Sequence, residues 1–117
     1  MEISTLVDAL MSHDALGARQ WVADAARQSM RWTEVPRPSR LSADKMALAA
    51  GIVELLAERA GQAAPEWTAA VSASPQKIFL VRSAESMPRL RRLCEEEGPI
   101  PLRRRQILAP PEFLTLA

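Results

Sequence analysis

The sequence has few of the residues that bind metals, form disulfides or build β-sandwiches. Among its 117 residues are one cysteine, one histidine and no tyrosine, and aromatic residues make up 4%. The single cysteine, Cys94, excludes an intramolecular disulfide, which is typical of a reducing cytoplasm. One histidine and one cysteine far apart give no cluster of metal ligands. No metal or other cofactor is predicted.

The sequence also lacks phosphate loops, targeting signals and long apolar runs. Its four glycines are scattered, so no glycine-rich phosphate loop is formed. The N-terminal stretch MEISTLVDAL has no basic region followed by an apolar one, so no signal peptide is expected. The longest apolar candidate, MALAAGIVELLAERA, is interrupted by Glu54 and Glu58 and falls short of the roughly 20 residues of a membrane span. We expect a cytoplasmic protein that does not enter the membrane.

The composition favours a single helical domain. An apolar fraction of 48% and a charged fraction of 25% are typical of soluble globular proteins, and the length fits one domain over residues 1–117. The net charge of +1 means that any attraction to polyanions must be local. Abundant Ala and Leu with few aromatics favour helices over sheets. We predict a mostly α, single-domain helical bundle with at most a short extended segment or two-stranded pair in its C-terminal half.

Hydrophobic periodicity places N-terminal helices within residues 4–30. Ser4 is the expected N-cap of the first helix, and Ser12 or Asp14 caps a second one. One continuous helix across this region is the alternative. Residues 31–40 contain two prolines and are predicted to be a linker.

The most secure prediction is a central helix over residues 42–60. Ser42 is its expected N-cap and Gly61 its natural stop. The helix is apolar over more than half of its circumference, so we expect it to lie at the centre of the fold.

The C-terminal subregion, residues 65–117, is rich in arginine. Pro65 is expected at the first position of a short helix whose Trp67 faces inward. The run QKIFLV is either a strand whose natural partner is RQIL or an extended buried segment. A helix is predicted between Pro88 and Gly98, and APPEFLTLA is expected to form one or two turns in which Phe113, Leu114 and Leu116 are available for packing.

No set of residues predicts catalysis. Ser12, His13 and Asp14 are the residue types of a hydrolase triad, but adjacent residues cannot face one another in that geometry. We interpret them as a capped turn between helices. Cys94 lacks a neighbouring base, and the pair Glu54 and Glu58, at i and i+4 on one helix, is interpreted as solvated. The sequence therefore predicts a protein that is not an enzyme.

The three tryptophans are interpreted mainly as core residues. Trp21 and Trp67 lie within helical patterns. Trp32 lies at the edge of the proline-containing linker, where it either covers the core or anchors a partner. We favour the first interpretation.

Arginines form the strongest local signal. Three arginines lie within one turn of the helix that begins at Pro88, and three more follow a proline-bounded turn. Folded together, these six cations would form one basic surface: Arg89, Arg91, Arg92, Arg103, Arg104 and Arg105. In the first helix the arginines precede Glu95 to Glu97, which is opposite to the preference of the helix dipole. The surface either pairs internally with those glutamates, binds nucleic acid, or docks an acidic protein partner.

The order of residues in the C-terminal half resembles that of small bacterial proteins encoded beside nucleotidyltransferase-like toxins. In that group a Pro-x-Trp element follows a long helix, and an acidic residue, a proline, a large apolar residue and two or three arginines lead into a short apolar run. The matching positions here are Pro65, Trp67, Glu97, Pro99 or Pro101, Leu102, Arg103 to Arg105, Ile107 and Leu108. The sequence departs from the pattern at Leu102, where the group usually has an aromatic residue.

The resemblance implies an antitoxin-like role, in which the protein binds a neighbouring toxin enzyme and holds it inactive. We therefore predict a non-catalytic protein-binding module whose partner is a protein, with a nucleotidyltransferase-like toxin as the candidate. A nucleic-acid-binding transcriptional regulator that uses the same basic surface is the alternative. The predicted contact residues are Arg89, Arg92, Arg103, Arg104, Arg105 and Trp67.

Overall fold

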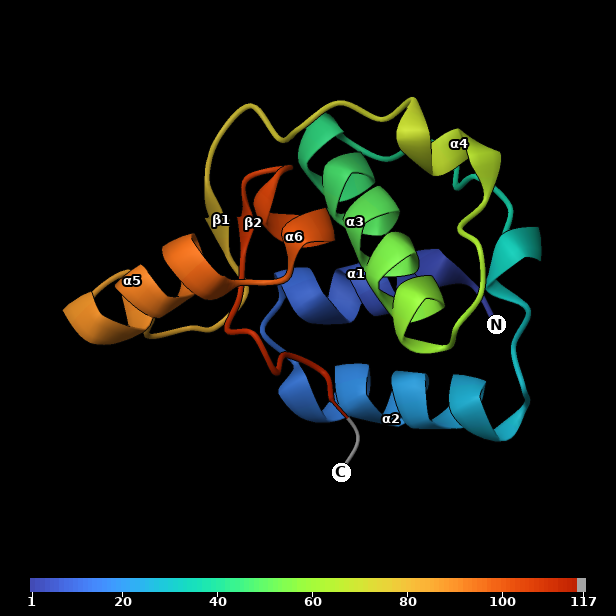
Figure 1. Ribbon diagram of the computed structural model, residues 1–117, viewed down its shortest axis with the longest axis horizontal. Helices are drawn as coiled ribbons and strands as arrows, with labels where there is room; N and C mark the ends of the chain where they lie inside the picture. Colours follow the sequence, from blue (N-terminus) through green and yellow to red (C-terminus); the bar gives the residue numbers. More distant parts are fainter. Residues whose placement is uncertain (116–117) are drawn as a thin grey trace.

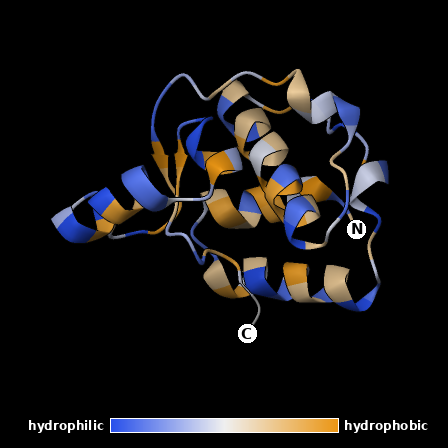
Figure 2. Ribbon diagram, viewed as in Figure 1, coloured by the Kyte–Doolittle hydropathy of each residue, from blue (hydrophilic) through white to orange (hydrophobic). Residues whose placement is uncertain are grey.

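Helix α3 (Ala43–Arg59) forms the centre of the fold, and helices from both halves of the chain surround it in the computed structural model, which describes residues 1–115 (Figure 1). Nearly every residue from Ala47 to Ala57 is buried, which explains why this helix is apolar on more than one face (Figure 2). The Ser42 hydroxyl accepts a hydrogen bond from the Lys45 amide, and Gly61 adopts φ +69° just after the helix. The predicted central helix is confirmed.

Two separate helices precede it, α1 (Ile3–Met11) and α2 (Ala15–Arg27). The chain breaks between them because His13 takes a left-handed conformation, with φ 59°, and the Asp14 carboxylate caps α2 by accepting from the Gly17 amide at 2.9 Å. The prediction of Ser4 as the first N-cap is wrong. Helix α1 begins at Ile3, which is buried in register with the inward face of the helix at Leu6, Val7 and Leu10.

The predicted linker is partly structured. It contains the 3₁₀ turn η1 (Trp32–Glu34), whose Trp32 is buried with its ring centre 6.2 Å from that of Trp21. The side-chain carbonyl of Gln62 accepts from the Trp32 amide at 2.8 Å, which fixes the turn to the end of α3. Trp32 therefore covers the core, as the sequence favours.

The C-terminal half adds three short helices and two strands to one end of this bundle. They are α4 (Glu66–Ala69), β1 (Ile78–Phe79), α5 (Pro88–Glu97), α6 (Ile100–Arg103) and β2 (Ile107–Leu108). The strands pair in parallel, with Ile78 opposite Ile107 and Phe79 opposite Leu108, so the two-stranded alternative for QKIFLV and RQIL is confirmed. Pro65 caps α4 instead of opening its first turn.

Helix α6 lies directly on α3, whereas α5 extends away from it (Figure 1). The close approach of α6 requires glycine at position 51, because an added Cβ would lie 2.9 Å from the Leu102 side chain. Helix α5 instead rests on the strand pair, through a small second cluster that contains Cys94, Leu108 and the half-buried Phe79 and Leu90.

The last described segment, residues 111–114, forms a turn, and Phe113 and Leu114 pack against the main core. The expected packing of Leu116 lies outside the described residues. No helix in the described range 1–115 is long and apolar enough to cross a membrane.

Candidate partner-binding site

The run Arg103–Arg105 spans the end of the single-turn helix α6, and this geometry sends its side chains in different directions. Prolines 99 and 101 fix the start of α6, and Arg104 is the C-cap of this turn. Gln106 then takes φ 64° and turns the chain into β2. As a result the Arg105 side chain is 5% exposed, whereas that of its neighbour Arg104 is 56% exposed.

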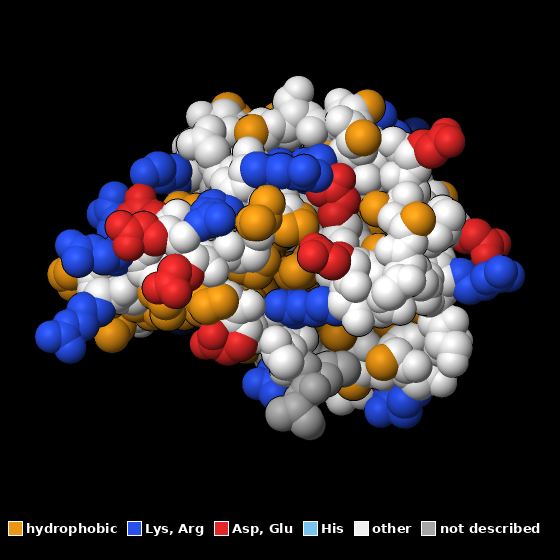
Figure 3. Space-filling view, viewed as in Figure 1, with side chains coloured by type: hydrophobic (Ala, Val, Ile, Leu, Met, Phe, Trp, Pro, Cys, Tyr) orange, Lys and Arg blue, Asp and Glu red, His pale blue; other side chains and the backbone are white. Residues whose placement is uncertain are grey.

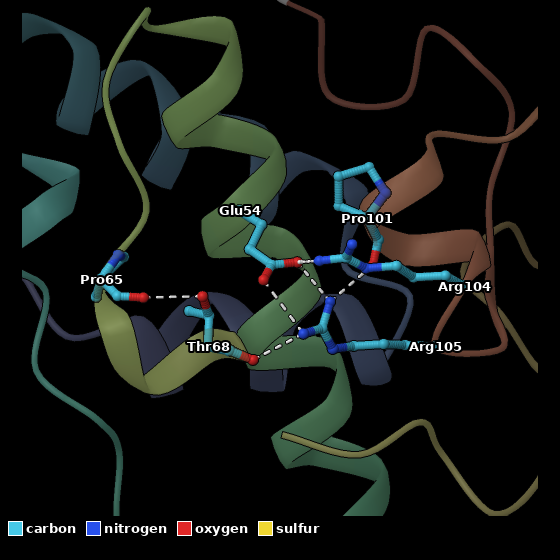
Figure 4. A network of polar contacts seen from close by, with 6 residues as sticks. All are labelled: Glu54, Pro65, Thr68, Pro101, Arg104 and Arg105. Atoms are coloured by element: carbon cyan, nitrogen blue, oxygen red, sulfur yellow. Dashed lines mark hydrogen bonds and ion pairs between the residues drawn. The ribbon is translucent and has the colours of Figure 1, made fainter. Parts of the chain in front are cut away.

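Arg105 joins three helices through an internal ion pair with Glu54 of α3 (Figure 4). Its Nη1 donates to Glu54 Oε1 at 2.5 Å, and its Nη2 donates to Oε2 at 3.2 Å. Nη2 also donates to the Thr68 carbonyl of α4 at 2.7 Å, and Nη1 to the Pro101 carbonyl of α6 at 3.3 Å. The planar guanidinium suits this two-point contact with a carboxylate.

Glu54 is the centre of this charge cluster. Its side chain is 10% exposed, and Arg104 Nη2 donates to Oε1 at 2.6 Å in addition to the Arg105 contacts. Burial would raise the pKa of Glu54, but hydrogen bonds from Arg105 and Arg104 outweigh it and hold the pKa below its ordinary value of 4.5. The carboxylate is therefore ionised at neutral pH. The interpretation of Glu54 as a solvated side chain is wrong.

The expectation of one basic surface from six arginines needs correction, because Arg105 lies inside the protein and is paired there. Arg103 is also engaged internally, since its Nη1 donates to the Glu96 carbonyl. Of this run only Arg104 presents a largely exposed guanidinium, and it too contacts Glu54.

The other three of the six arginines, all on helix α5, are exposed: Arg89, Arg91 and Arg92. Arg91 Nε donates to Glu95 at 3.3 Å, its guanidinium lies 5.7 Å from the centre of the Phe79 ring, and Lys77 pairs with the other oxygen of Glu95 at 2.8 Å. Arg89 and Arg92 form no ion pair with any residue of 1–115.

A shallow groove of about 240 Å³ lies on α5 beside these two arginines. It is lined by Pro88, Arg89, Arg92, Leu93, Glu96 and Glu97. Figure 3 shows that Lys and Arg side chains gather over the projecting end of the molecule that α5 forms, with acidic side chains between them. The exposed charge on α5 is thus mixed.

The other candidate residues have structural contacts. The half-buried Trp67 donates from Nε1 to the Val35 carbonyl at 2.8 Å and so ties α4 to the segment after η1. Cys94 is buried, and burial raises the pKa of its thiol, as do the nearby carboxylates of Glu112 and Glu95. A thiol with a raised pKa is a poor nucleophile at neutral pH.

The turn at 12–14 has the capping role expected from the sequence, with the Ser12 hydroxyl donating to the Ala9 carbonyl at 3.2 Å. Within the described part of the chain, no group of three or more His, Cys, Asp or Glu side chains is placed to hold a metal ion.

Comparison with protein-family models, with curated proteins and with solved structures gave no match for this chain. Function is therefore inferred from the residues and their contacts.

Sequence reasoning missed the partner of Arg105. The available signal was Glu54 itself, a carboxylate within a helix whose neighbours on both sides, Val53 and Leu55, are buried. A charge at such a position needs a partner. The arginine run is the densest group of cations in the chain, although it lies far from Glu54 in sequence.

Proposed function

We propose that the protein is a non-catalytic binding module that docks an acidic protein partner on helix α5. The observation that carries this proposal is the pair Arg89 and Arg92, exposed on a projecting helix and without an ion pair among residues 1–115. Arginine is enriched at protein interfaces because its planar guanidinium binds carboxylates at two points.

The charge order of α5 supports an external partner. Its first turn holds arginines but no acidic residue, and its last turn holds glutamates but no basic residue. Each unfavourable charge at a helix end costs about 0.3–1 kcal/mol. At the C-terminal end of α5, ion pairs to Glu95 and the hydrogen bond from Arg103 to the Glu96 carbonyl offset part of that cost. At the N-terminal end, a partner's carboxylates on Arg89 and Arg92 would offset it.

The same helix favours a protein over a nucleic acid. Glu96 and Glu97 are exposed and line the same groove as Arg89 and Arg92, so a phosphate backbone would be repelled where it approached the arginines. A protein surface offers side chains of both signs. The net charge of +1 adds no long-range attraction to polyanions.

In the antitoxin-like form of the proposal, the partner is a nucleotidyltransferase-like toxin encoded in the adjacent reading frame. The support is the resemblance of the C-terminal half to such antitoxins. Five of the matching residues are buried here: Pro65, Leu102, Arg105, Ile107 and Leu108. These buried residues therefore stabilise the fold of the segment. We assign the contact with the partner to α5 and to the exposed Arg104.

The test is co-expression of the protein with the product of the adjacent frame, followed by isothermal titration calorimetry of the purified pair. Substituting Arg89→Glu with Arg92→Glu should weaken the complex at least tenfold, since a lost interfacial charge contact commonly costs more than about 1.4 kcal/mol. The control is Arg37→Glu with Arg40→Glu, which changes the net charge equally on exposed residues outside α5.

An α5 variant that binds the partner as tightly as the unmodified protein would contradict the proposal, as would equal losses in the α5 and control variants. Retention of DNA or RNA that falls steeply with salt and disappears in the α5 variant would favour the nucleic-acid alternative. Far-ultraviolet circular dichroism of each variant checks that the fold is intact.

A further inference from the structure

A pocket of about 340 Å³ opens on a different part of the surface from the outer groove of α5. It lies where the turn between α1 and α2, the end of β1 and the C-terminal turn meet. Its inner wall is apolar and includes the buried side chains of Leu10, Ala18 and Leu80, together with the half-buried Phe113 and Leu114. A volume of this size, with a mainly apolar lining, is typical of a small-molecule site.

Two arginines belong to the lining of this pocket. Arg19 comes from α2 and Arg82 from the segment after β1; both are exposed, and neither has an ion pair or a hydrogen bond from its side chain within residues 1–115. They come from elements 63 positions apart in sequence and converge on one apolar cavity.

The remaining polar side chains of the lining are His13, Asp14 and Glu112. The Asp14 carboxylate is already engaged, because it accepts from the Gly17 amide as the cap of α2. The two carboxylates and the two arginines of the lining cancel in formal charge. The lining therefore favours a ligand with one negative charge over a doubly charged phosphate.

We propose that this pocket binds a small amphipathic monocarboxylate, with its apolar body against Leu10, Leu80 and Phe113 and its carboxylate on Arg19 or Arg82. Burial of the apolar body supplies affinity, at about 25 cal/mol for each Å² removed from water. The guanidinium groups supply the preference for a carboxylate, because they bind its two oxygens at once. This proposal does not rest on partner docking by α5.

The test compares three probes of equal chain length on the full chain: octanoate, 1-octanol and octylamine. Two-dimensional ¹H–¹⁵N NMR titrations should show saturable shifts at residues 13–19, 80–82 and 112–114 with octanoate. 1-Octanol, which shares the apolar body, should bind more weakly at the same residues, and octylamine, a cation at neutral pH, weakest of all.

The decisive variant is Arg19→Gln with Arg82→Gln, on exposed residues whose substitution leaves the core untouched. It should lower the ratio of the octanoate affinity to the 1-octanol affinity about tenfold, which corresponds to about 1.4 kcal/mol. The variant should still bind 1-octanol. The matched control is Arg27→Gln with Arg31→Gln, which lie outside the pocket lining and should leave all three titrations unchanged.

A second variant, Ala9→Phe, places a ring in the half-buried lining and should reduce the binding of octanoate and 1-octanol together. The proposal is overturned if octanoate gives no saturable shifts or shifts at other residues. It is equally overturned if octylamine binds as well as octanoate, or if the arginine variant keeps the full preference for the carboxylate.

Discussion

Arg105 and the pair Arg89 and Arg92 belong to two similar clusters in sequence but have opposite environments in the fold. Arg105 is buried on Glu54 and bonded to carbonyls of α4 and α6. Arg89 and Arg92 lie on α5, exposed and without an ion pair in the described chain. The difference arises because α3 presents a nearly buried carboxylate to Arg105, whereas no element within residues 1–115 presents one to Arg89 or Arg92.

This comparison shows that a run of arginines does not by itself predict a basic surface. A guanidinium is buried and paired where the packing of distant elements brings a desolvated carboxylate to it, and otherwise it stays exposed. Removal of a buried, paired arginine destabilises the fold because it leaves its carboxylate without a partner, whereas an exposed, unpaired arginine is available for binding. Each of the following predictions tests one side of this division.

The largest expected effect is that of Arg105→Gln. Removing the guanidinium leaves Glu54 nearly buried, with Arg104 as its one charged partner among residues 1–115, and also removes the donor to the Thr68 carbonyl. We expect the free energy of unfolding to fall by about 3 kcal/mol, measured by urea denaturation at pH 7. A loss below about 0.5 kcal/mol would mean that Arg105 does not fasten α3, α4 and α6.

Acidification should weaken the same cluster. The pKa of Glu54 is lowered in the folded protein, so its contribution is fully present above the unfolded pKa, near 4.5, and is lost as the pH falls through the folded value. The difference in free energy of unfolding between the unmodified protein and Glu54→Gln should therefore shrink from pH 7 toward pH 3. A constant difference over this range would show that the Glu54 carboxylate is not stabilised by folding.

Arg104→Gln should have a smaller effect. Arg104 contacts the same carboxylate at 2.6 Å, but its side chain is 56% exposed and its charge is screened by water. We expect a loss of about 0.5–1 kcal/mol in the same urea experiment, well below that at position 105. Equal losses at the two positions would contradict the distinction between the inner and the outer arginine.

The smallest effect is expected from Arg89→Glu, and its sign is reversed. Position 89 lies in the first turn of α5, where a negative charge is favoured by the helix dipole. The free energy of unfolding should stay level or rise by about 0.3–1 kcal/mol. A clear loss of stability would indicate that Arg89 has an internal structural role instead of being available to a partner.

Much of the fold follows from local sequence signals. Caps at Asp14 and Ser42, the stop at Gly61 and the apolar periodicity of α3 act within a few residues, so they could be predicted without the tertiary structure. The start of α1 cannot be predicted in this way, because the burial of Ile3 decides it and burial is a tertiary property.

The candidate site could be predicted only where its contacts are local. The pair Arg91 and Glu95 is spaced i, i+4 on one helix, so pairing of the arginines with that glutamate run can be predicted from the sequence. Glu54 and Arg105 are 51 positions apart, and no spacing rule joins them. The pocket at Arg19 and Arg82 is likewise made by elements that meet only in the folded chain.

The most direct test of the division between inner and outer arginines is a double-mutant cycle on Glu54 and Arg105, with Glu54→Gln, Arg105→Gln and both together. Urea unfolding at pH 7 gives the four free energies, and their combination isolates the energy of the pair. The structure predicts a favourable coupling of about 2–3 kcal/mol, because both side chains are nearly buried and meet at two points. A coupling energy near zero would contradict the internal ion pair between Glu54 and Arg105, and with it the division between inner and outer arginines.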